Sequence, residues 1–258
     1  MDGQKLKWSL SADALKWIAL VTMLADHIGV ALLKTARTIT IPATGNGVYA
    51  IVISELPFRL IGRIAFPLFC YLLVQGFLHT HSVQRYAVRL AIFALISELP
   101  FDWMIFGRAS LRSQNVYFTL LIGLLTLCAL RALERRPSRT KWLGMGGALI
   151  LAMALAYALR TDYDMMGVAL IAALYLTRKD RYRQCALSAT LFLAVYFLQT
   201  LALGRSMAGP LLEIACLPAF ALILRCDGER RTRVGKYAFY AFYPAHMLAL
   251  YGLSRLLS

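Results

Sequence analysis

Two histidines inside apolar stretches, one near each end of the chain, are the residues best suited to chemistry. His27 follows Asp26 directly, and His246 comes three residues after Tyr243. An imidazole takes up and releases a proton near neutral pH, so it can act as a general base or as a nucleophile. Ionisable groups inside a membrane are costly and are usually functional. The alternative is that each histidine only bonds a neighbouring carbonyl group.

The spacing of two lysines predicts that both histidines lie at a similar depth. Lys16 precedes His27 by 11 residues, and Lys236 precedes His246 by 10. At about 1.5 Å of rise per residue these intervals span roughly 16 and 15 Å, about half of a hydrocarbon core of about 30 Å. We therefore expect both rings near the midplane of a membrane. The spacing alone leaves open whether they share one site.

Asp26 is expected to have a different partner from its neighbour His27. Successive helical residues point about 100° apart, so Asp26 does not face the same way as His27. A cation from another helix, such as Arg63 or Arg59, is the expected partner of this carboxylate. Two inward polar faces on one helix indicate a wet cavity rather than lipid.

The residues before His246 predict a tyrosine beside its ring and a kink in its helix. Tyr243 lies on the same side of that helix as His246. Pro244 lacks a backbone N–H, so we expect it to kink the helix and free a carbonyl group.

The composition is typical of a membrane protein with many spans. Of the 258 residues, 60% are hydrophobic and 16% are charged, and the mean hydropathy is +0.63. Soluble domains average about 25% charged residues. We predict an all-α fold with a single integral-membrane domain over residues 1–258 and about nine transmembrane helices, of which the seventh is short and is therefore tilted, packed inside or begins earlier. The expected spans are 16–33, 60–79, 87–105, 115–131, 142–159, 165–177, 184–203, 210–224 and 237–254.

The net charge of +15 is distributed as in a membrane protein and does not indicate nucleic-acid binding. With the amino terminus in the cytoplasm, the inner segments hold 19 of the 28 lysines and arginines. Such an excess is what the positive-inside rule predicts beside anionic lipid. A tenth crossing would break this pattern, so we expect the stretch 47–59 to be interfacial or re-entrant.

Several other polar residues fall at the predicted ends of spans. One group could line the outer mouth of a cavity and bind an acceptor, or could equally cap helices. This group is Glu98, Asp102, Gln114 and Asn115. His79 and His81 have no acidic or cysteine partner near in sequence, so we expect an interfacial structural role. The five cysteines are dispersed, which favours neither a metal site nor a disulfide framework.

The chain resembles the TraX family, the conjugal-transfer pilin acetylases, over nearly its whole length, and four matching stretches carry the resemblance. The stretches are LADHIG at 24–29, IGRIAFPLF at 61–69, FALISELPFD at 93–102 and QNVYFTL at 114–120. This resemblance implies a bacterial inner-membrane protein.

A wider likeness is to the membrane acyltransferase-3 proteins, whose first helix carries an arginine and, after ten further residues, a histidine. In this chain Lys16 replaces that arginine, which weakens a bidentate phosphate contact, and no helix follows the span of His246. The likeness implies an acyltransferase-3-like helical bundle with acetyl-CoA as donor and no metal. The donor-binding residues it implies are Lys16, Lys236 and Arg63.

These resemblances imply an acetyltransferase that modifies an amine or hydroxyl of an envelope acceptor, such as a pilin amino terminus or a surface glycan. His27 would be the general base or would carry the acetyl group, supported by Asp26. His246 and Tyr243 would stabilise the oxyanion or move the proton. Two other functions remain open from the residues alone, a proton-coupled transporter using Asp26 and His27 and a structural partner of a secretion apparatus.

Overall fold

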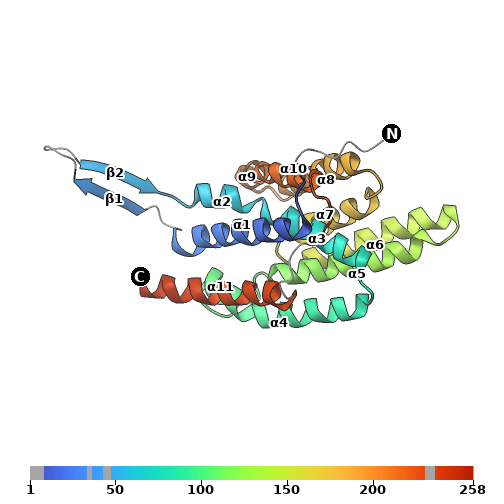
Figure 1. The fold of residues 1–258 in the computed structure, drawn as a ribbon, viewed down its shortest axis with the longest axis horizontal. Helices are drawn as coiled ribbons and strands as arrows, with labels where there is room; N and C mark the ends of the chain where they lie inside the picture. Colours follow the sequence, from blue (N-terminus) through green and yellow to red (C-terminus); the bar gives the residue numbers. More distant parts are fainter. Residues whose placement is uncertain (1–8, 34–36, 43–47, 230–235, 258) are drawn as a thin grey trace.

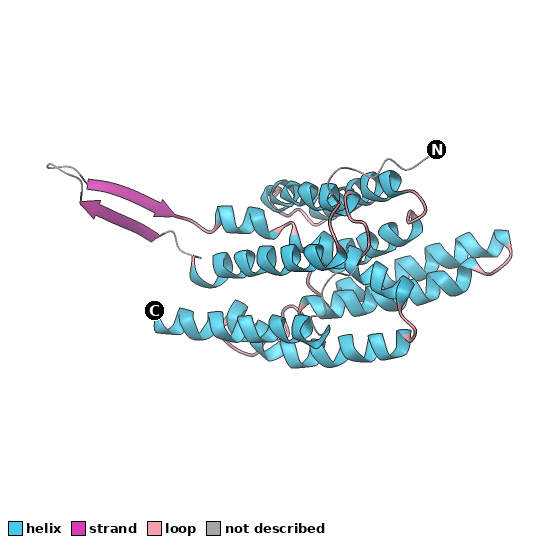
Figure 2. Cartoon of the chain, in the orientation of Figure 1, coloured by secondary structure: helices cyan, strands magenta, loops and turns pink. Residues whose placement is uncertain are grey.

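The computed structural model describes residues 9–33, 37–42, 48–229 and 236–257 of the chain. In this part of the chain long helices run side by side along the longest axis of the molecule, and one β-hairpin extends from one end (Figures 1 and 2). The helices before and after the hairpin are α1 (Ala12–Leu32), α2 (Leu56–Gly62), α3 (Ala65–His79), α4 (Val83–Phe106), α5 (Val116–Glu134), α6 (Ser138–Ala158), α7 (Asp164–Leu176), α8 (Arg181–Ala202), α9 (Ala208–Glu213), the 3-10 turn η1 (Ile214–Cys216), α10 (Leu217–Leu224) and α11 (Lys236–Leu256).

The helices coincide with the predicted apolar spans, and the protein is a helical membrane protein. Five described segments are long and apolar enough to cross a membrane, and two further apolar helices are shorter. The five are Ala12–Leu32, Leu56–His79, Val116–Glu134, Thr140–Ala158 and Arg181–Ala202. The count of about nine spanning helices stays a prediction.

The short helix α7 owes its length and composition to its place in the centre of the bundle. Every residue from Met166 to Tyr175 is buried. It packs against α3, α5, α6 and α8. A helix surrounded by protein needs no polar face, which explains its nearly uniform apolar sequence. Of the explanations offered for this short span, packing inside the bundle is confirmed.

Two of the spans are broken helices, and their breaks face each other. One is α2 and α3, which are interrupted at Arg63 and Ile64, and the other is α9, η1 and α10. The short helix α2 contacts α9 and η1, while α3 contacts η1 and α10. Pro67 and Pro218 stand in the first turns of α3 and α10, the helices that follow the two breaks, and proline is well tolerated in a first turn. The hydropathy pattern did not indicate these two breaks.

The stretch predicted to be interfacial or re-entrant is divided between two elements. Strand β1 (Arg37–Pro42) pairs antiparallel with β2 (Val48–Ile53), with Ile39 opposite Ile51. Residues 54–55 then lead into α2, whose first turn contains residues 56–59. The hairpin extends away from the helices (Figure 2). Val, Ile and Thr dominate both strands, and β-branched residues favour extended backbone, which the hydropathy of the stretch did not reveal. Residue 47 lies outside the described residues.

A close approach between α1 and α2 depends on Gly62. A Cβ atom added at this position would collide with the side chain of Asp26. The absence of a side chain at Gly62 therefore lets Asp26 reach the arginines of the second helix.

We expect Gly62→Ala to lower the free energy of unfolding by about 1–3 kcal/mol, the usual cost of overpacking a close contact. Thermal unfolding of the purified protein in detergent would measure this loss. Gly146→Ala is the matched control, because nothing lies within 4 Å of a Cβ at that helical position. Equal unfolding temperatures for both variants would contradict the role of Gly62.

Candidate active site

The two histidines from opposite ends of the chain are hydrogen-bonded to each other. His27 on α1 and His246 on α11 place Nδ1 and Nε2 2.6 Å apart, across 219 residues of sequence. Their ring planes differ by 7° and their centroids are 4.9 Å apart. Two stacked ring faces cannot bring atoms this close, so the rings meet edge to edge in nearly one plane. The structure thus brings into one site two residues whose spacing left the question open.

The second nitrogen of His246 is also engaged. Its Nδ1 lies 2.7 Å from the backbone oxygen of Phe242, one turn earlier on α11. His246 lies ten residues from either end of this helix, whereas His27 lies five residues before the end of α1. The pair is therefore central with respect to α11 but not with respect to α1, and its depth in a membrane stays a prediction.

Tyr243 forms an aromatic wall beside the histidine pair. Its ring centroid is 6.0 Å from that of His27 and 5.7 Å from that of His246. Tyr117 of α5 packs edge-on against Tyr243 at 5.0 Å. The Tyr243 hydroxyl lies against the backbone of Val116. The structure therefore places the Tyr243 ring in the site, while its role toward an oxyanion stays a prediction.

The carbonyl freed by Pro244 has a partner on another helix. Proline has no N–H to donate to the residue four positions earlier, which is Tyr240. The hydroxyl of Tyr117 donates to the Tyr240 oxygen at 3.1 Å. The predicted free carbonyl is confirmed, and the bond ties α5 to α11 next to the histidines.

Asp26 belongs to a buried network of charges that adjoins His27. Arg59 donates to one of its carboxylate oxygens at 2.7 Å, and Arg63 donates to the other at 3.0 Å. Arg63 also donates to Glu213, whose side chain is 1% exposed, at 3.1 Å. The predicted pairing of Asp26 with Arg63 or Arg59 is confirmed, and the carboxylate in fact pairs with both. Sequence reasoning missed Glu213 as a member, because it lies 150 residues after Arg63.

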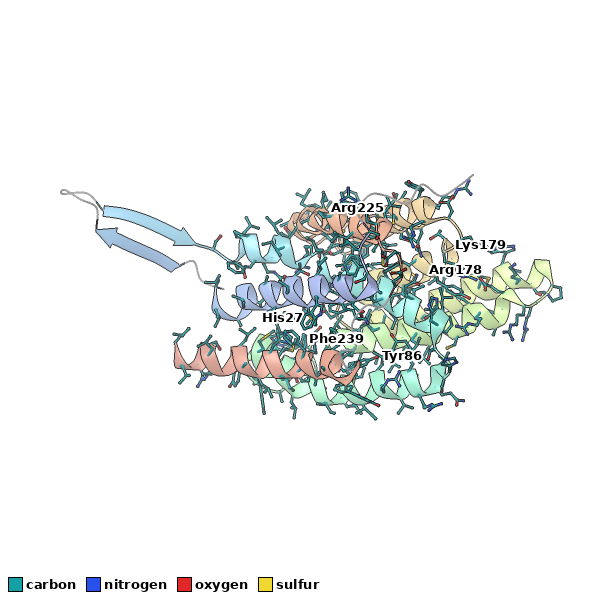
Figure 3. All side chains as sticks on the ribbon, in the orientation of Figure 1. His27, Tyr86, Arg178, Lys179, Arg225 and Phe239 are labelled. Atoms are coloured by element: carbon teal, nitrogen blue, oxygen red, sulfur yellow. The ribbon has the colours of Figure 1, made fainter. Side chains whose placement is uncertain are left out.

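A cavity of about 420 Å³ opens between α1, α3, α4, α5 and α11. In Figure 3, His27, Phe239 and Tyr86 follow one another from the histidine pair toward the end of the bundle opposite the hairpin. The basic and imidazole side chains that line the cavity are Lys16, His79, His81 and Arg89. The aromatic side chains are Phe69, Tyr86, Tyr117, Phe239 and Tyr240. Tyr117 lines the cavity and contacts Tyr243, which in turn contacts both histidines, so these two rings lead from the cavity to the histidine pair.

Arg89 provides the cavity with a buried donor. It is hydrogen-bonded to the Tyr240 side chain, while its Nε is buried without a hydrogen-bond partner among the described residues. Lys16 lies 3.0 Å from Asp13 and 5.5 Å from the centre of the Phe239 ring. Sequence reasoning included Lys16 but missed Arg89. Arg89 comes three residues after Tyr86 on α4, and this spacing could have indicated that the two side chains face the same way.

His79 and His81 line the cavity, which the sequence did not indicate, and their interfacial structural role stays a prediction. They were expected to be interfacial structural residues, since no partner is near in sequence. His79 Nδ1 lies 2.8 Å from the Gln75 oxygen. The cavity wall is formed by distant helices, which the local sequence does not reveal.

A model of the TraX protein family matches residues 11–254. The chain is a member of the TraX family. A curated relative, the probable fimbrial assembly protein FimC, serogroup H1, of Dichelobacter nodosus, is 31% identical over 252 residues, which cover 93% of this chain and 94% of the relative. No solved structure matches the chain. The wider likeness to membrane acyltransferase-3 proteins therefore stays a prediction.

Of the predicted donor-binding residues of this TraX protein, Lys16 lines the described cavity and Arg63 lies away from it. Arg63 is engaged in the charge network with Asp26 and Glu213 and does not line the cavity. Lys236 is the first residue of α11, but its side chain lies outside the described part of the structure.

The predicted acceptor-binding residues gather at one helix junction. The Asn115 side chain accepts from Tyr117 N at 3.0 Å and caps α5, while it donates to Glu98 at 2.5 Å. Asp102 accepts from Ser110 N at 2.8 Å, and the backbone N–H of Gln114 donates to the carbonyl oxygen of residue 160 at 3.0 Å. The capping alternative accounts for the bond of Asn115 to Tyr117 N, while the bonds of Asp102 and Gln114 hold the connection between α4 and α5. One oxygen of Glu98 and one of Asp102 have no partner among the described residues, and a role toward an acceptor stays a prediction.

The described residues contain no group of three or more His, Cys, Asp or Glu side chains that could hold a metal ion. All five cysteines are free thiols.

We expect Arg63→Gln to lower the free energy of unfolding by about 3–5 kcal/mol, because removing one member of a buried ion pair leaves carboxylates without compensation. Asp26 and Glu213 would each lose a charged donor. Thermal unfolding in detergent measures the effect. Arg183→Gln is the control, since its pair with Asp180 is 78% and 48% exposed, and exposed pairs contribute little. A similar loss in both variants would contradict this account.

Proposed function

We propose that this TraX protein is an integral-membrane acetyltransferase. It would transfer the acetyl group of acetyl-CoA to an amine or hydroxyl of an envelope acceptor, such as a pilin amino terminus or a surface glycan. The observation that carries the proposal is the hydrogen bond between His27 and His246, which the rings of Tyr243 and Tyr117 connect to a basic cavity. The name of the relative, a probable fimbrial assembly protein, supports an acceptor connected with pili.

The cavity suits the acyl donor in size and chemistry. Its volume of about 420 Å³ lies within the usual range of about 300–1,000 Å³ for small-molecule sites. Lys16 and Arg89 offer positive charge for the phosphates, and the unpartnered Nε of Arg89 needs an acceptor. The aromatic wall would hold the apolar part of the pantetheine arm and direct the thioester toward His27. Lys236, from the start of α11, would add to the positive charge at the mouth.

The orientation that we propose places the end of the bundle opposite the hairpin in the cytoplasm. Arg178 and Lys179 lie toward the end of the bundle away from the hairpin (Figure 3), as do the ends of the α5–α6 pair. Basic segments favour the cytoplasmic side of a bacterial inner membrane, where acetyl-CoA is found. The acceptor would then approach from the membrane or from the side of Glu98, Asp102, Gln114 and Asn115.

His27 is the residue that we propose as the base. It removes a proton from the acceptor as the acceptor nitrogen or oxygen forms a bond with the thioester carbonyl carbon. The carbon–sulfur bond then breaks, and the sulfur leaves as a thiolate that takes the same proton back from His27. The other route consistent with the residues is attack by His27 itself and a transient acetyl-histidine. Asp26 and Arg63 stabilise the helix that carries His27 in either route.

The geometry favours this function over a proton-coupled transporter that uses Asp26 as a relay. A relay needs a carboxylate that can exchange protons as water or substrate arrives. Both carboxylate oxygens of Asp26 instead accept hydrogen bonds from arginines. Arginine donors therefore already occupy the two atoms through which Asp26 would exchange protons with water or substrate.

We expect isothermal titration of the purified, monodisperse protein with acetyl-CoA to show saturable binding. Arg89→Gln should weaken this binding by about 10–100-fold, the loss expected when one charged hydrogen bond of about 1.5–3 kcal/mol is removed. His27→Gln should keep binding but reduce acetyl transfer by about 10²–10⁴-fold, because it removes the base.

Arg112→Gln is the matched control for charge, since Arg112 is exposed and does not line the cavity. It should leave both binding and transfer unchanged. Absence of acetyl-CoA binding by the folded wild-type protein would overturn the proposed function. Normal transfer by folded His27→Gln would remove His27 from the reaction.

A further inference from the structure

We infer that His246 is a positioning residue that holds His27 in a single tautomer, with the proton on Nδ1 and the lone pair on Nε2. This inference rests on the proposed function for its catalytic meaning, because Nε2 of His27 then becomes the atom that takes the acceptor proton. The tautomer itself is a property of the hydrogen bonds and does not depend on any reaction.

The direction of the chain of hydrogen bonds follows from the group at its end. The backbone oxygen of Phe242 can only accept, so the Nδ1 of His246, 2.7 Å away, must carry a proton. In neutral His246 the other nitrogen, Nε2, is then an acceptor. His27 Nδ1 lies 2.6 Å from that acceptor and must donate to it. The opposite arrangement would place the lone pair of His246 Nδ1 against the lone pair of the carbonyl oxygen.

The ring geometry fits a directional hydrogen bond. The 7° angle between the planes and the centroid distance of 4.9 Å place the two rings edge to edge. In this arrangement the N–H of one imidazole points along its ring plane at the lone pair of the other. Hydrogen bonds prefer such near-linear geometry.

The surroundings of His246 give its ring little freedom to turn. Its side chain is buried, with 7% exposure. The Phe242 ring stacks on it at 4.8 Å, and the Tyr243 ring meets it edge-on at 5.7 Å. Its Nδ1 is held by its own helix, so the orientation of Nε2 toward α1 is set by α11 itself. A partner fixed in this way can fix His27 in turn.

The same chain supports the charge that develops during the reaction. When His27 Nε2 takes the acceptor proton, the ring becomes an imidazolium whose Nδ1–H still donates to His246. This stronger, charge-assisted hydrogen bond stabilises the cation without moving any proton into His246. Nε2 then returns its proton to the departing thiolate, and both histidines regain their starting tautomers. The arrangement has the logic of a nucleophile–base–orienter triad, with a second imidazole as the orienting group.

The test compares two substitutions of similar size at position 246. His246→Gln keeps an oxygen that can accept from His27 Nδ1–H, whereas His246→Leu removes every acceptor. Leu248→Ala is the matched control on α11, because Leu248 is exposed two residues further on. The full-length protein, labelled with 15N at histidine, is studied in detergent micelles by NMR. A His27→Gln spectrum assigns the His27 signals.

We expect wild type, Leu248→Ala and His246→Gln to show His27 with its proton on Nδ1, and His246→Leu to show a shift toward Nε2–H. Acetyl transfer should fall by about 10²-fold or more in His246→Leu, in line with the loss of general-base catalysis. It should stay within about tenfold of wild type in His246→Gln. Unfolding temperatures of both variants establish that each is folded.

A proton on Nε2 of His27 in the wild-type protein would overturn the inference, and so would an unchanged tautomer in folded His246→Leu. Equal loss of transfer in His246→Gln and His246→Leu would also overturn it. If the wild type shows the expected tautomer but no acetyl transfer, the proposed function fails while the positioning of His27 by His246 stands. The two failures are therefore distinguishable.

Discussion

The buried charge network around Asp26 is the interaction on which the rest of the structure depends. Isolated charges are not tolerated in an apolar interior, so Asp26, Arg59, Arg63 and Glu213 must compensate one another. The network joins α1 to the break between α2 and α3 and to the end of α9. It therefore fixes both the rotation of α1 and the meeting point of the two broken helices, and the small size of Gly62 permits that approach.

The rotation of α1 has a direct chemical consequence. Adjacent helical residues point about 100° apart, so a helix whose Asp26 faces α2 turns His27 toward a different neighbour, which is α11. One residue anchors the helix and the next enters the proposed site. On α11, Pro244 and the carbonyl of Phe242 play comparable parts. Pro244 has no N–H for the Tyr240 oxygen, which therefore accepts from Tyr117. The Phe242 carbonyl oxygen accepts from His246 and holds its ring. The site is thus built from backbone groups as much as from side chains.

The agreement between sequence and structure is uneven for physical reasons. The helices and the pairing of Asp26 with two arginines follow from hydropathy, helix periodicity and charge compensation, which are readable locally. The broken helices were missed because an apolar run looks the same whether or not the helix is continuous. His79 and Arg89 were missed as cavity residues because a cavity is a property of several packed helices. For Asn115 the sequence left two roles open, acceptor binding and helix capping, and its contacts are those of a helix cap.

The sequence by itself determined that this is a basic, helical membrane protein with ionisable residues inside its apolar helices, because composition and the 3.6-residue period are local properties. It also marked the two histidines as candidates. Only the tertiary structure decided that His27 and His246 meet, that Glu213 completes the network, and that an aromatic, basic cavity lies beside them. These contacts join residues 219 and 150 positions apart. Their geometry depends on how the helices rotate and pack, which local sequence does not specify.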